Sequence, residues 1–588
     1  MSRIAGLFSA AGQIKTKAVR RTSRLFAQSI TLSVADKIRS GFLTLSLNVC
    51  GMFFLTYGIY TVISAVLLHY FASSFAGNIS LFSGVAMAAC AVPMLFSKDN
   101  ITGALASSNI GRDLCKYIGV RMVSMVQEKK TGHLNQGFAL GVVAGTLSIV
   151  LSTEGVLWAM LIALVCAVCF ALPATGVMFC AAVLPFSHDR LLALVSIVTV
   201  LAFFVKLLRG KRTVNFHISG TVFCIFHLMF TLHILFGKDC TVLTSWKYVI
   251  FVSSYFLFCF ILNSCRSCVR TMIVASVACG ALSAAYCVGY GSFALLSELP
   301  SGFSVDASYI LDFVTELHLF SDGSAHVLIC AAVPLTVGMA LRRDHRVPRW
   351  LLWFSATANI IFLILTDSVA YLAFSVFALI VLLLIYGKKY VYFALGALSI
   401  FSAVASFAFP SVGNALSALP HAVFEYTAGT HRFFASLSEL SGGELILGSS
   451  LFAGSGENFY SHMIISFGLI VFLCFIAFLA TTLFLSVRFL IKTVGIDKKR
   501  DTFNRFDSVR CAADTRLGCI APLLSATVLL VCGSTTDLFS CGVLFMLLWM
   551  LLGICASYRR NALKEMAKAE AAESFTATRR SAEAMIRF

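Results

Sequence analysis

Charged residues are scarce in this chain of 588 residues. Lys, Arg, Asp and Glu make up 12% of the sequence, whereas 59% of the residues are hydrophobic and the mean hydropathy is +0.90. Soluble domains carry about 25% charged residues, so the composition excludes an ordinary soluble protein. Apolar runs recur from residue 42 to residue 556, and a run of about 17 to 25 apolar residues crosses a bilayer as a helix. The sequence therefore predicts an all-α, polytopic transmembrane protein.

Acidic residues are even scarcer than basic ones: 27 Asp and Glu accompany 45 Lys and Arg, which gives a net charge of +18. The basic excess lies in short blocks beside the apolar runs, at 15–24, 209–212, 266–270, 342–349, 388–389, 488–516 and 559–587. Cytoplasmic loops of membrane proteins collect Lys and Arg, and each such residue near the surface attracts anionic lipid by about 1 kcal/mol. This distribution predicts membrane lipids as partners and no nucleic-acid partner.

If the apolar runs are counted as spans from a cytoplasmic N-terminus, every basic block falls on the cytoplasmic side. The sequence therefore predicts a multi-pass protein of the cytoplasmic membrane with both termini in the cytoplasm. We expect roughly 14 to 16 spans. The predicted parts are a basic N-terminal segment (1–41), extra N-terminal spans with a cytoplasmic amphipathic segment (42–135), a membrane core (136–408), an extracytoplasmic loop (409–462), the C-terminal spans (463–556) and a basic cytoplasmic tail (557–588). The long loop thus precedes the last three spans.

Sequence motifs for metal or nucleotide binding are missing. The chain has no phosphate-binding glycine loop followed by Lys and no HExxH. Cys265 and Cys268 form one CxxC without a second pair, and His227 and His233 lie six residues apart, which places them on different faces of a helix. We therefore expect no metal site and no cofactor.

Cations are almost absent from residues 409–462, where Arg432 is the only Lys or Arg. The same segment holds three histidines and four glutamates: His421, His431, His462, Glu425, Glu439, Glu444 and Glu457. A second segment, 290–324, also lacks Lys and Arg, and its apolar residues favour an amphipathic helix on the same side of the membrane. Because translocated loops lack positive charge, 409–462 is predicted to be an outward-facing working surface.

Arg432 suits a phosphate-binding role because its guanidinium offers a planar fork to phosphate oxygens. His462 or Glu457 could take the proton from an acceptor hydroxyl as a general base. The alternative is structural, with Arg432 paired to Glu425 or Glu439 within the loop. The residues alone leave both readings open.

Three short motifs resemble the C-terminal half of the O-antigen ligase and O-antigen polymerase family. They are THRFFASL around Arg432, the LILGSS turn, and ENFYSH leading to ISFGLIVF, in which Gly468 follows Asn458 by ten residues as in the family. The outer turn LTDSVAYLAF, with Ser368, is similar to the family's Thr-x-Ser-Arg-Gly turn. The resemblance covers about residues 155–555 and implies a catalytic role for Arg432 and substrate binding for Asn458 and Ser368.

Two family positions are replaced here. Glu457 stands where the family has His, with His462 the nearest histidine, and Val369 stands where the family has the arginine of the Ser-Arg turn. Either His462 or Glu457 takes the role of base, or the chain is a divergent member with altered or lost activity. Arg190, in the predicted outer turn 187–190, could supply the missing phosphate-binding cation, or it could be an ordinary membrane-interface residue.

The resemblance implies a membrane ligase or polymerase that transfers a saccharide from a polyprenyl-diphosphate donor to the hydroxyl of a glycan or lipid acceptor outside the membrane, with inversion and without a metal. Two alternatives remain. One is a flippase for lipid-linked oligosaccharide or polysaccharide, although such transporters usually show internal repeats and charged residues within their spans. The other is a non-catalytic membrane scaffold, which the two replaced positions leave open.

Overall fold

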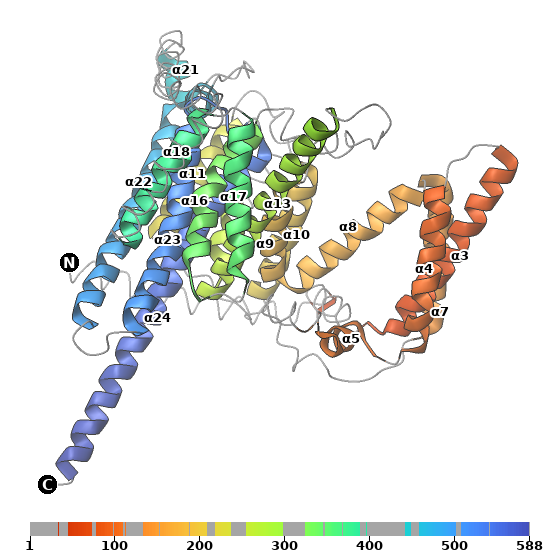
Figure 1. Ribbon diagram of the computed structural model, residues 1–588, viewed down its shortest axis with the longest axis horizontal. Coiled ribbons are helices and arrows are strands. Elements are labelled where there is room, and N and C mark those ends of the chain that lie inside the picture. Colours follow the sequence, from red (N-terminus) through yellow and green to blue (C-terminus); the bar gives the residue numbers. More distant parts are fainter. Residues whose placement is uncertain are drawn as a thin grey trace. The chain divides into compact units, whose positions relative to one another are not determined.

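The computed structural model describes residues 33–34, 45–72, 78–97, 99–109, 112, 133–151, 153–186, 189–208, 218–236, 254–297, 324–344, 347–366, 369–387, 396, 442–448, 458–500, 507–539 and 541–586. Over these ranges the regular structure is helical, apart from one isolated bridge between Ser46 and Asn100. Seven helices there are long and apolar enough to cross a membrane, and six further apolar helices are shorter. The predicted class is confirmed: this is an all-α, multi-pass membrane protein (Figure 1). The total number of spans stays a prediction.

Each apolar run within the described residues lies in a helix, and some helices continue into polar sequence. The first helices are α3 (Leu47–Ala72), α4 (Asn78–Phe96), α5 (Ile101–Ser107), α7 (Leu134–Leu151), α8 (Thr153–Ala171), α9 (Pro173–Val183), α10 (Asp189–Leu208) and α11 (Ile218–Phe236). A short π-helix (Leu257–Ile261) comes next. The later helices are α13 (Cys265–Ser297), α16 (Ser324–Leu341), α17 (Arg349–Leu365), α18 (Val369–Tyr386), α21 (Gly442–Leu447), α22 (Phe459–Arg500), α23 (Asp507–Cys532) and α24 (Gly542–Ile586).

The chain falls into two compact units, of which unit 1 comprises 1–176 and 198–213, and unit 2 comprises 177–197 and 214–588. In unit 1, α3 packs against both α4 and α7. Glycines line these contacts: a Cβ atom added to Gly58 of α3 would lie 2.7 Å from the Gly84 carbonyl oxygen of α4, and one added to Gly141 of α7 would lie 2.7 Å from Thr56. Small residues let helix backbones approach closely, which is how helices associate in lipid without a hydrophobic driving force.

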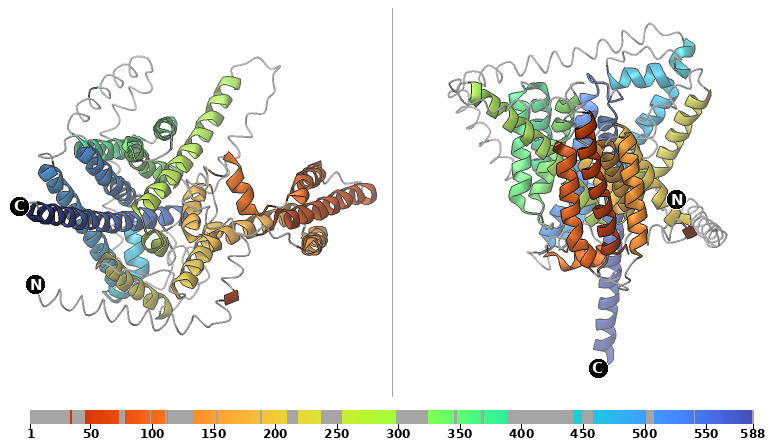
Figure 2. Two further views of the ribbon diagram at one scale, coloured as in Figure 1. Left: turned by 90° about the horizontal axis from the view of Figure 1, so that it is seen from below. Right: turned by 90° about the vertical axis from the view of Figure 1, so that its right-hand side faces the viewer.

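Unit 2 is built around α16 and the membrane part of α24. Of the apolar stretch of each helix, 89% is buried for α16 and 100% for α24. Both helices are apolar on all sides, and such helices occupy interior positions. Around α16 lie α13, α17, α18 and α23, and α22 packs against α11 and α23. The last turns of α24 extend beyond the other described helices of this unit (Figure 2).

The two ends of the unit 2 bundle differ in charge. The start of α13, the end of α16 and the middle of α24 lie at one end, which we call the Arg342 end. Helix α21 and the start of α22 lie at the opposite end, which we call the His462 end (Figure 1). From α13 onward, the structure describes charged side chains of Lys, Arg, Asp and Glu. All of them lie at the Arg342 end except Asp537. This asymmetry is what an oriented membrane protein shows.

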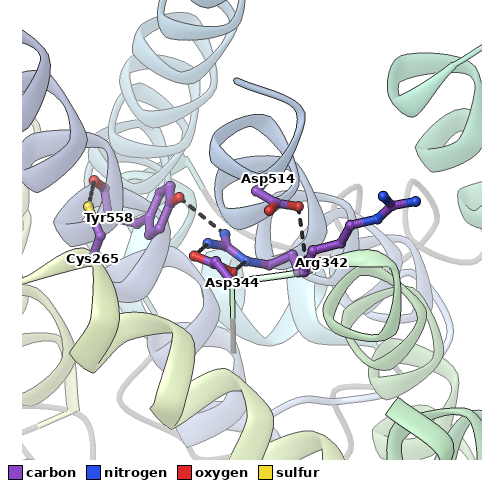
Figure 3. Close-up of polar contacts among 6 residues, drawn as sticks. Cys265, Arg342, Asp344, Asp514 and Tyr558 are labelled. Carbon is purple, nitrogen blue, oxygen red and sulfur yellow. Dashed lines mark hydrogen bonds and ion pairs between the residues drawn. The ribbon is translucent and has the colours of Figure 1, made fainter. Parts of the chain in front are cut away.

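Polar contacts fasten several helices together at the Arg342 end (Figure 3). The Arg342 side chain is 2% exposed; its Nε donates to Asp344 at 2.9 Å and its Nη1 donates to the Tyr558 hydroxyl of α24 at 3.1 Å. The next backbone N–H, of Arg343, donates to Asp514 of α23 at 3.2 Å. Because a buried guanidinium needs its charge and donors satisfied, this network ties α16, α23 and α24 together at one level.

Candidate active site

Helix α22 starts at a buried asparagine. Asn458 is 4% exposed, and its side-chain oxygen accepts the backbone N–H of Ser461 at 2.8 Å, while its backbone carbonyl accepts that of His462 at 3.0 Å. Asparagine is among the preferred residues at this position because its side chain satisfies an N–H that has no partner within the helix. The described contacts of Asn458 therefore fix where α22 begins and which way His462 faces.

The turn between α23 and α24 folds back onto this helix start. The backbone N–H of Phe459 is shared between the carbonyl oxygens of Gly533 and Thr536, at 2.9 and 3.2 Å. The Tyr460 hydroxyl donates to the carbonyl of Leu530 at 2.7 Å. Two segments that are distant in the sequence are thereby held side by side at the His462 end.

This folding brings His462 and Asp537 together. His462 Nδ1 lies 2.8 Å from Asp537 Oδ2, and the two side chains are only 14% and 15% exposed. The other carboxylate oxygen, Oδ1, accepts the backbone N–H of Phe539 at 2.9 Å. A neutral imidazole that donates from Nδ1 to a carboxylate carries its basic lone pair on Nε2. The arrangement orients a histidine for proton transfer.

Two aromatic rings lie beside the His462 imidazole. The Phe539 ring lies 5.1 Å from the His462 ring, and the Phe467 ring lies 6.2 Å from it. These rings exclude water from part of the imidazole, which strengthens its hydrogen bond to Asp537.

Gly448 and Gly468, one from each of two resembling motifs, meet beside this site. Gly448 follows α21 with φ +85°, and Gly468 interrupts α22 with φ 81° and ψ 164°. A Cβ atom on Gly448 would lie 2.7 Å from the Ser466 carbonyl oxygen and 3.0 Å from the Gly468 nitrogen. Glycine is needed at both positions, because positive φ is costly for other residues and a side chain has no room at Gly448. The break sets off residues 459–467, which carry His462, as a separate short helical segment.

The predicted site residues are only partly within the described structure. His462 and Asn458 lie together at the start of α22, whereas Arg432, Glu457 and Ser368 lie outside the described residues. Arg190 is exposed in the first turn of α10, which is not among the helices that form the His462 site. The roles assigned to these residues stay predictions.

Asp537 and Tyr371 are the site residues that the sequence analysis missed. The Tyr371 hydroxyl of α18 lies 3.3 Å from the Thr536 hydroxyl, next to Asp537. A signal for Asp537 exists in the sequence, because it is the only acidic residue between Asp514 and Glu565 and it interrupts a strongly apolar stretch. Ionisable residues in such stretches commonly serve a function. No comparable signal distinguishes Tyr371 from the other tyrosines.

Within the described residues, no group of three or more His, Cys, Asp and Glu side chains is placed to hold a metal ion. Comparison of the chain with protein-family models, with curated proteins and with solved structures found no match. The assignment of a function therefore depends on the geometry of the His462 end and on the motifs that meet there.

Proposed function

We propose that this protein is a membrane glycan ligase or polymerase that transfers a saccharide from a polyprenyl-diphosphate-linked donor to an acceptor hydroxyl. The observation that carries the proposal is the His462–Asp537 pair, at 2.8 Å and largely shielded from water. His462 ends the segment ENFYSH, and the following segment ISFGLIVF contacts LILGSS through Gly448 and Gly468; these are the segments that prompted the resemblance. A base for activating a hydroxyl is the group that such a transfer needs.

In the proposed reaction, His462 Nε2 removes the proton from the acceptor hydroxyl. The hydroxyl oxygen forms a bond to the anomeric carbon while the bond from that carbon to the diphosphate oxygen breaks, so the sugar configuration inverts. Asp537 stabilises the imidazolium that results. The polyprenyl diphosphate leaves with its electron pair, and Arg432 of the preceding segment is proposed to bind its phosphate oxygens.

His462 is preferred over Glu457 as the base because of its partner. The carboxylate of Asp537 selects one tautomer of His462 and holds the ring in place, and aromatic rings restrict water around it. Glu457 precedes the buried cap Asn458 by one residue and is kept as the competing base in the test below.

The charge asymmetry of unit 2 supports an orientation for this site. The described basic side chains from α13 onward lie at the Arg342 end. We therefore propose that this end faces the cytoplasm and that the His462 end faces outward, where lipid-linked glycans are assembled. Both termini are proposed to be cytoplasmic.

The test is a transfer assay in proteoliposomes with radiolabelled lipid-linked saccharides extracted from the producing cells. His462→Ala should lower transfer by about 10²–10⁴-fold, the usual contribution of a general base. Arg432→Lys should lower it by about 100-fold if roughly 3 kcal/mol of phosphate binding in the transition state is lost. Glu457→Gln should retain activity, and His133→Ala, at an exposed histidine of unit 1, is the matched control.

Two results would contradict the proposal. Full transfer by His462→Ala and Arg432→Lys would show that neither group takes part in catalysis. Movement of the lipid-linked saccharide across the bilayer without any transfer would identify a transporter instead.

A further inference from the structure

Tyr371 of α18 links the core of unit 2 to the turn that carries Asp537. It lies in LTDSVAYLAF, a segment that prompted the resemblance and to which the proposed reaction assigns no role. The Tyr371 hydroxyl lies 3.3 Å from the hydroxyl of Thr536, the residue before Asp537. Helix α18 also packs against α23, which ends just before this turn. The segment is therefore in contact with the candidate active site.

The backbone of Tyr371 is fixed to the buried helix α16. The Cys330 thiol of α16 donates to the Tyr371 carbonyl oxygen at 3.1 Å. The Ser375 hydroxyl lies 3.0 Å from the same oxygen and 3.2 Å from the carbonyl oxygen of Cys330. The His326 ring of α16 lies nearly parallel to the Tyr371 ring, at an interplanar angle of 16°. Since the apolar stretch of α16 is 89% buried, Tyr371 has a rigid support, and its hydroxyl is held in place beside the turn.

Two other helices contact the turn between α23 and α24. From α22, the Phe459 N–H bonds two carbonyl oxygens of the turn, one of them that of Thr536 at 3.2 Å. From α18, the Tyr371 hydroxyl contacts the Thr536 side chain. Because Thr536 and Asp537 share a peptide bond, a shift of Thr536 also moves the carboxylate that faces His462. Catalytic groups need to be held within about 0.5 Å of their productive geometry by the residues around them.

We propose that Tyr371 is a positioning residue whose hydroxyl holds Thr536 and thereby keeps the Asp537 carboxylate in line with His462 Nδ1. This inference rests on the proposed transferase function and deepens it, because it assigns a role to LTDSVAYLAF. In this role Tyr371 acts through Asp537 and not on the substrate. Its removal should therefore lower the rate of the chemical step and leave the binding of donor and acceptor unchanged.

The alternative is that the Tyr371 hydroxyl only joins helices and contributes to stability. Tyr558 provides the matched comparison, because its buried hydroxyl also joins two helices by accepting from Arg342 at 3.1 Å, but at the opposite end of unit 2. Tyr371→Phe keeps the ring beside His326 and removes the hydroxyl, and Tyr558→Phe makes the same change away from the site. The two variants together separate an effect on the site from a general loss of stability.

Hydrogen–deuterium exchange of the full chain tests the hold on the turn without any substrate. Tyr371→Phe should speed the exchange of backbone amides in residues 533–539, whereas Tyr558→Phe should leave these amides unchanged. Equal exchange of the turn in wild type and Tyr371→Phe would overturn the proposal.

Initial-rate transfer from the radiolabelled lipid-linked saccharides tests the effect on catalysis. Tyr371→Phe should lower the maximal rate by about 2- to 10-fold, as expected for loss of one hydrogen bond between uncharged groups, at unchanged half-saturating concentrations. Thr536→Val removes the partner hydroxyl and should have the same effect, whereas Thr536→Ser, which retains it, should keep most of the activity. Tyr558→Phe should transfer at the wild-type rate. In an Asp537→Asn background, Tyr371→Phe should cause no further loss, because both changes act on the same pair.

The outcomes separate this inference from the proposed function. Full transfer by Tyr371→Phe, in a protein that depends on His462, would leave the transferase and remove the positioning role. A higher half-saturating acceptor concentration at unchanged maximal rate would mean that Tyr371 contacts the substrate, and independent losses in the double variant would show that it does not act through Asp537. Faster exchange in Tyr371→Phe without transfer by the wild type would show that the contact holds the turn but serves no transfer reaction.

Discussion

The pairing of His462 with Asp537 predicts a specific pattern in a double-mutant cycle. Asp537→Asn is the informative change because it keeps the shape of the side chain and keeps an Oδ1 that accepts the Phe539 N–H. It removes the negative charge facing His462 Nδ1 and replaces the accepting Oδ2 with an NH2 donor, so the imidazole proton has to move from Nδ1 to Nε2. The variant should therefore fold, and its thermal unfolding should stay cooperative.

The size of the effect follows from the contact. A hydrogen bond to a charged group contributes about 1.5–3 kcal/mol, and the pair is shielded from water, with side chains 14% and 15% exposed. Asp537→Asn should therefore lower glycan transfer by roughly 10- to 150-fold. His462→Ala should cost about 10²–10⁴-fold, because the base itself is lost.

The combination of the two changes is the decisive measurement. If Asp537 acts only through His462, the double variant should be no slower than His462→Ala alone, since residues that act as a unit have non-additive effects. The assay is initial-rate transfer from labelled lipid-linked saccharide in proteoliposomes, with melting curves for each variant. Multiplication of the two single losses in the double variant would refute the reasoning.

Three further predictions concern the fold and its orientation. Gly448→Ala should destabilise the protein by about 1–3 kcal/mol in thermal unfolding, because alanine is strained at φ +85° and would clash with the Ser466 carbonyl; unchanged stability would contradict the described contact. Arg342→Met should lower the free energy of unfolding by about 1–3 kcal/mol, since it removes the contacts to Tyr558 and to the half-exposed Asp344. The control Arg343→Met, at an exposed position, should change it by no more than about 0.5 kcal/mol. Equal effects would be inconsistent with the buried network. A membrane-impermeant thiol reagent should label a cysteine introduced at residue 441 from outside intact cells and fail to label one at residue 501, and the reverse pattern would invert the proposed topology.

Most helices of the fold are predictable from the sequence because length and apolarity decide whether a segment can cross a bilayer. The apolar run at 325–341 in the sequence forms α16, which spans Ser324–Leu341. Helix ends are less predictable where the helix continues into polar sequence. The apolar run at 271–289 in the sequence belongs to α13, which extends over Cys265–Ser297, because backbone hydrogen bonding does not stop at the membrane surface.

The candidate site was predictable only in part. His462 stood out because it lies before an apolar run in a segment almost without cations. Its partner Asp537 is 75 residues away, and the two meet because the Phe459 N–H bonds the turn after α23. Such a contact depends on how helices pack, and one sequence alone holds no periodicity that reveals it. The same holds for Gly448 and Gly468, whose motifs could be recognised but whose contact could not.

The location of Asp537 favours a functional role for its negative charge. It is the exception among the charged side chains described from α13 onward, since the others lie at the Arg342 end. If its role were only to accept the Phe539 N–H in a turn, asparagine would serve equally well, and it would avoid the cost of shielding a carboxylate from water. The carboxylate is better explained by what it faces: a histidine that must accept a proton is stabilised in its charged form by a nearby negative charge. If Asp537 only accepted a hydrogen bond in the turn, replacement by Asn would have little effect. If it stabilises the charged form of a general base, the replacement should lower transfer.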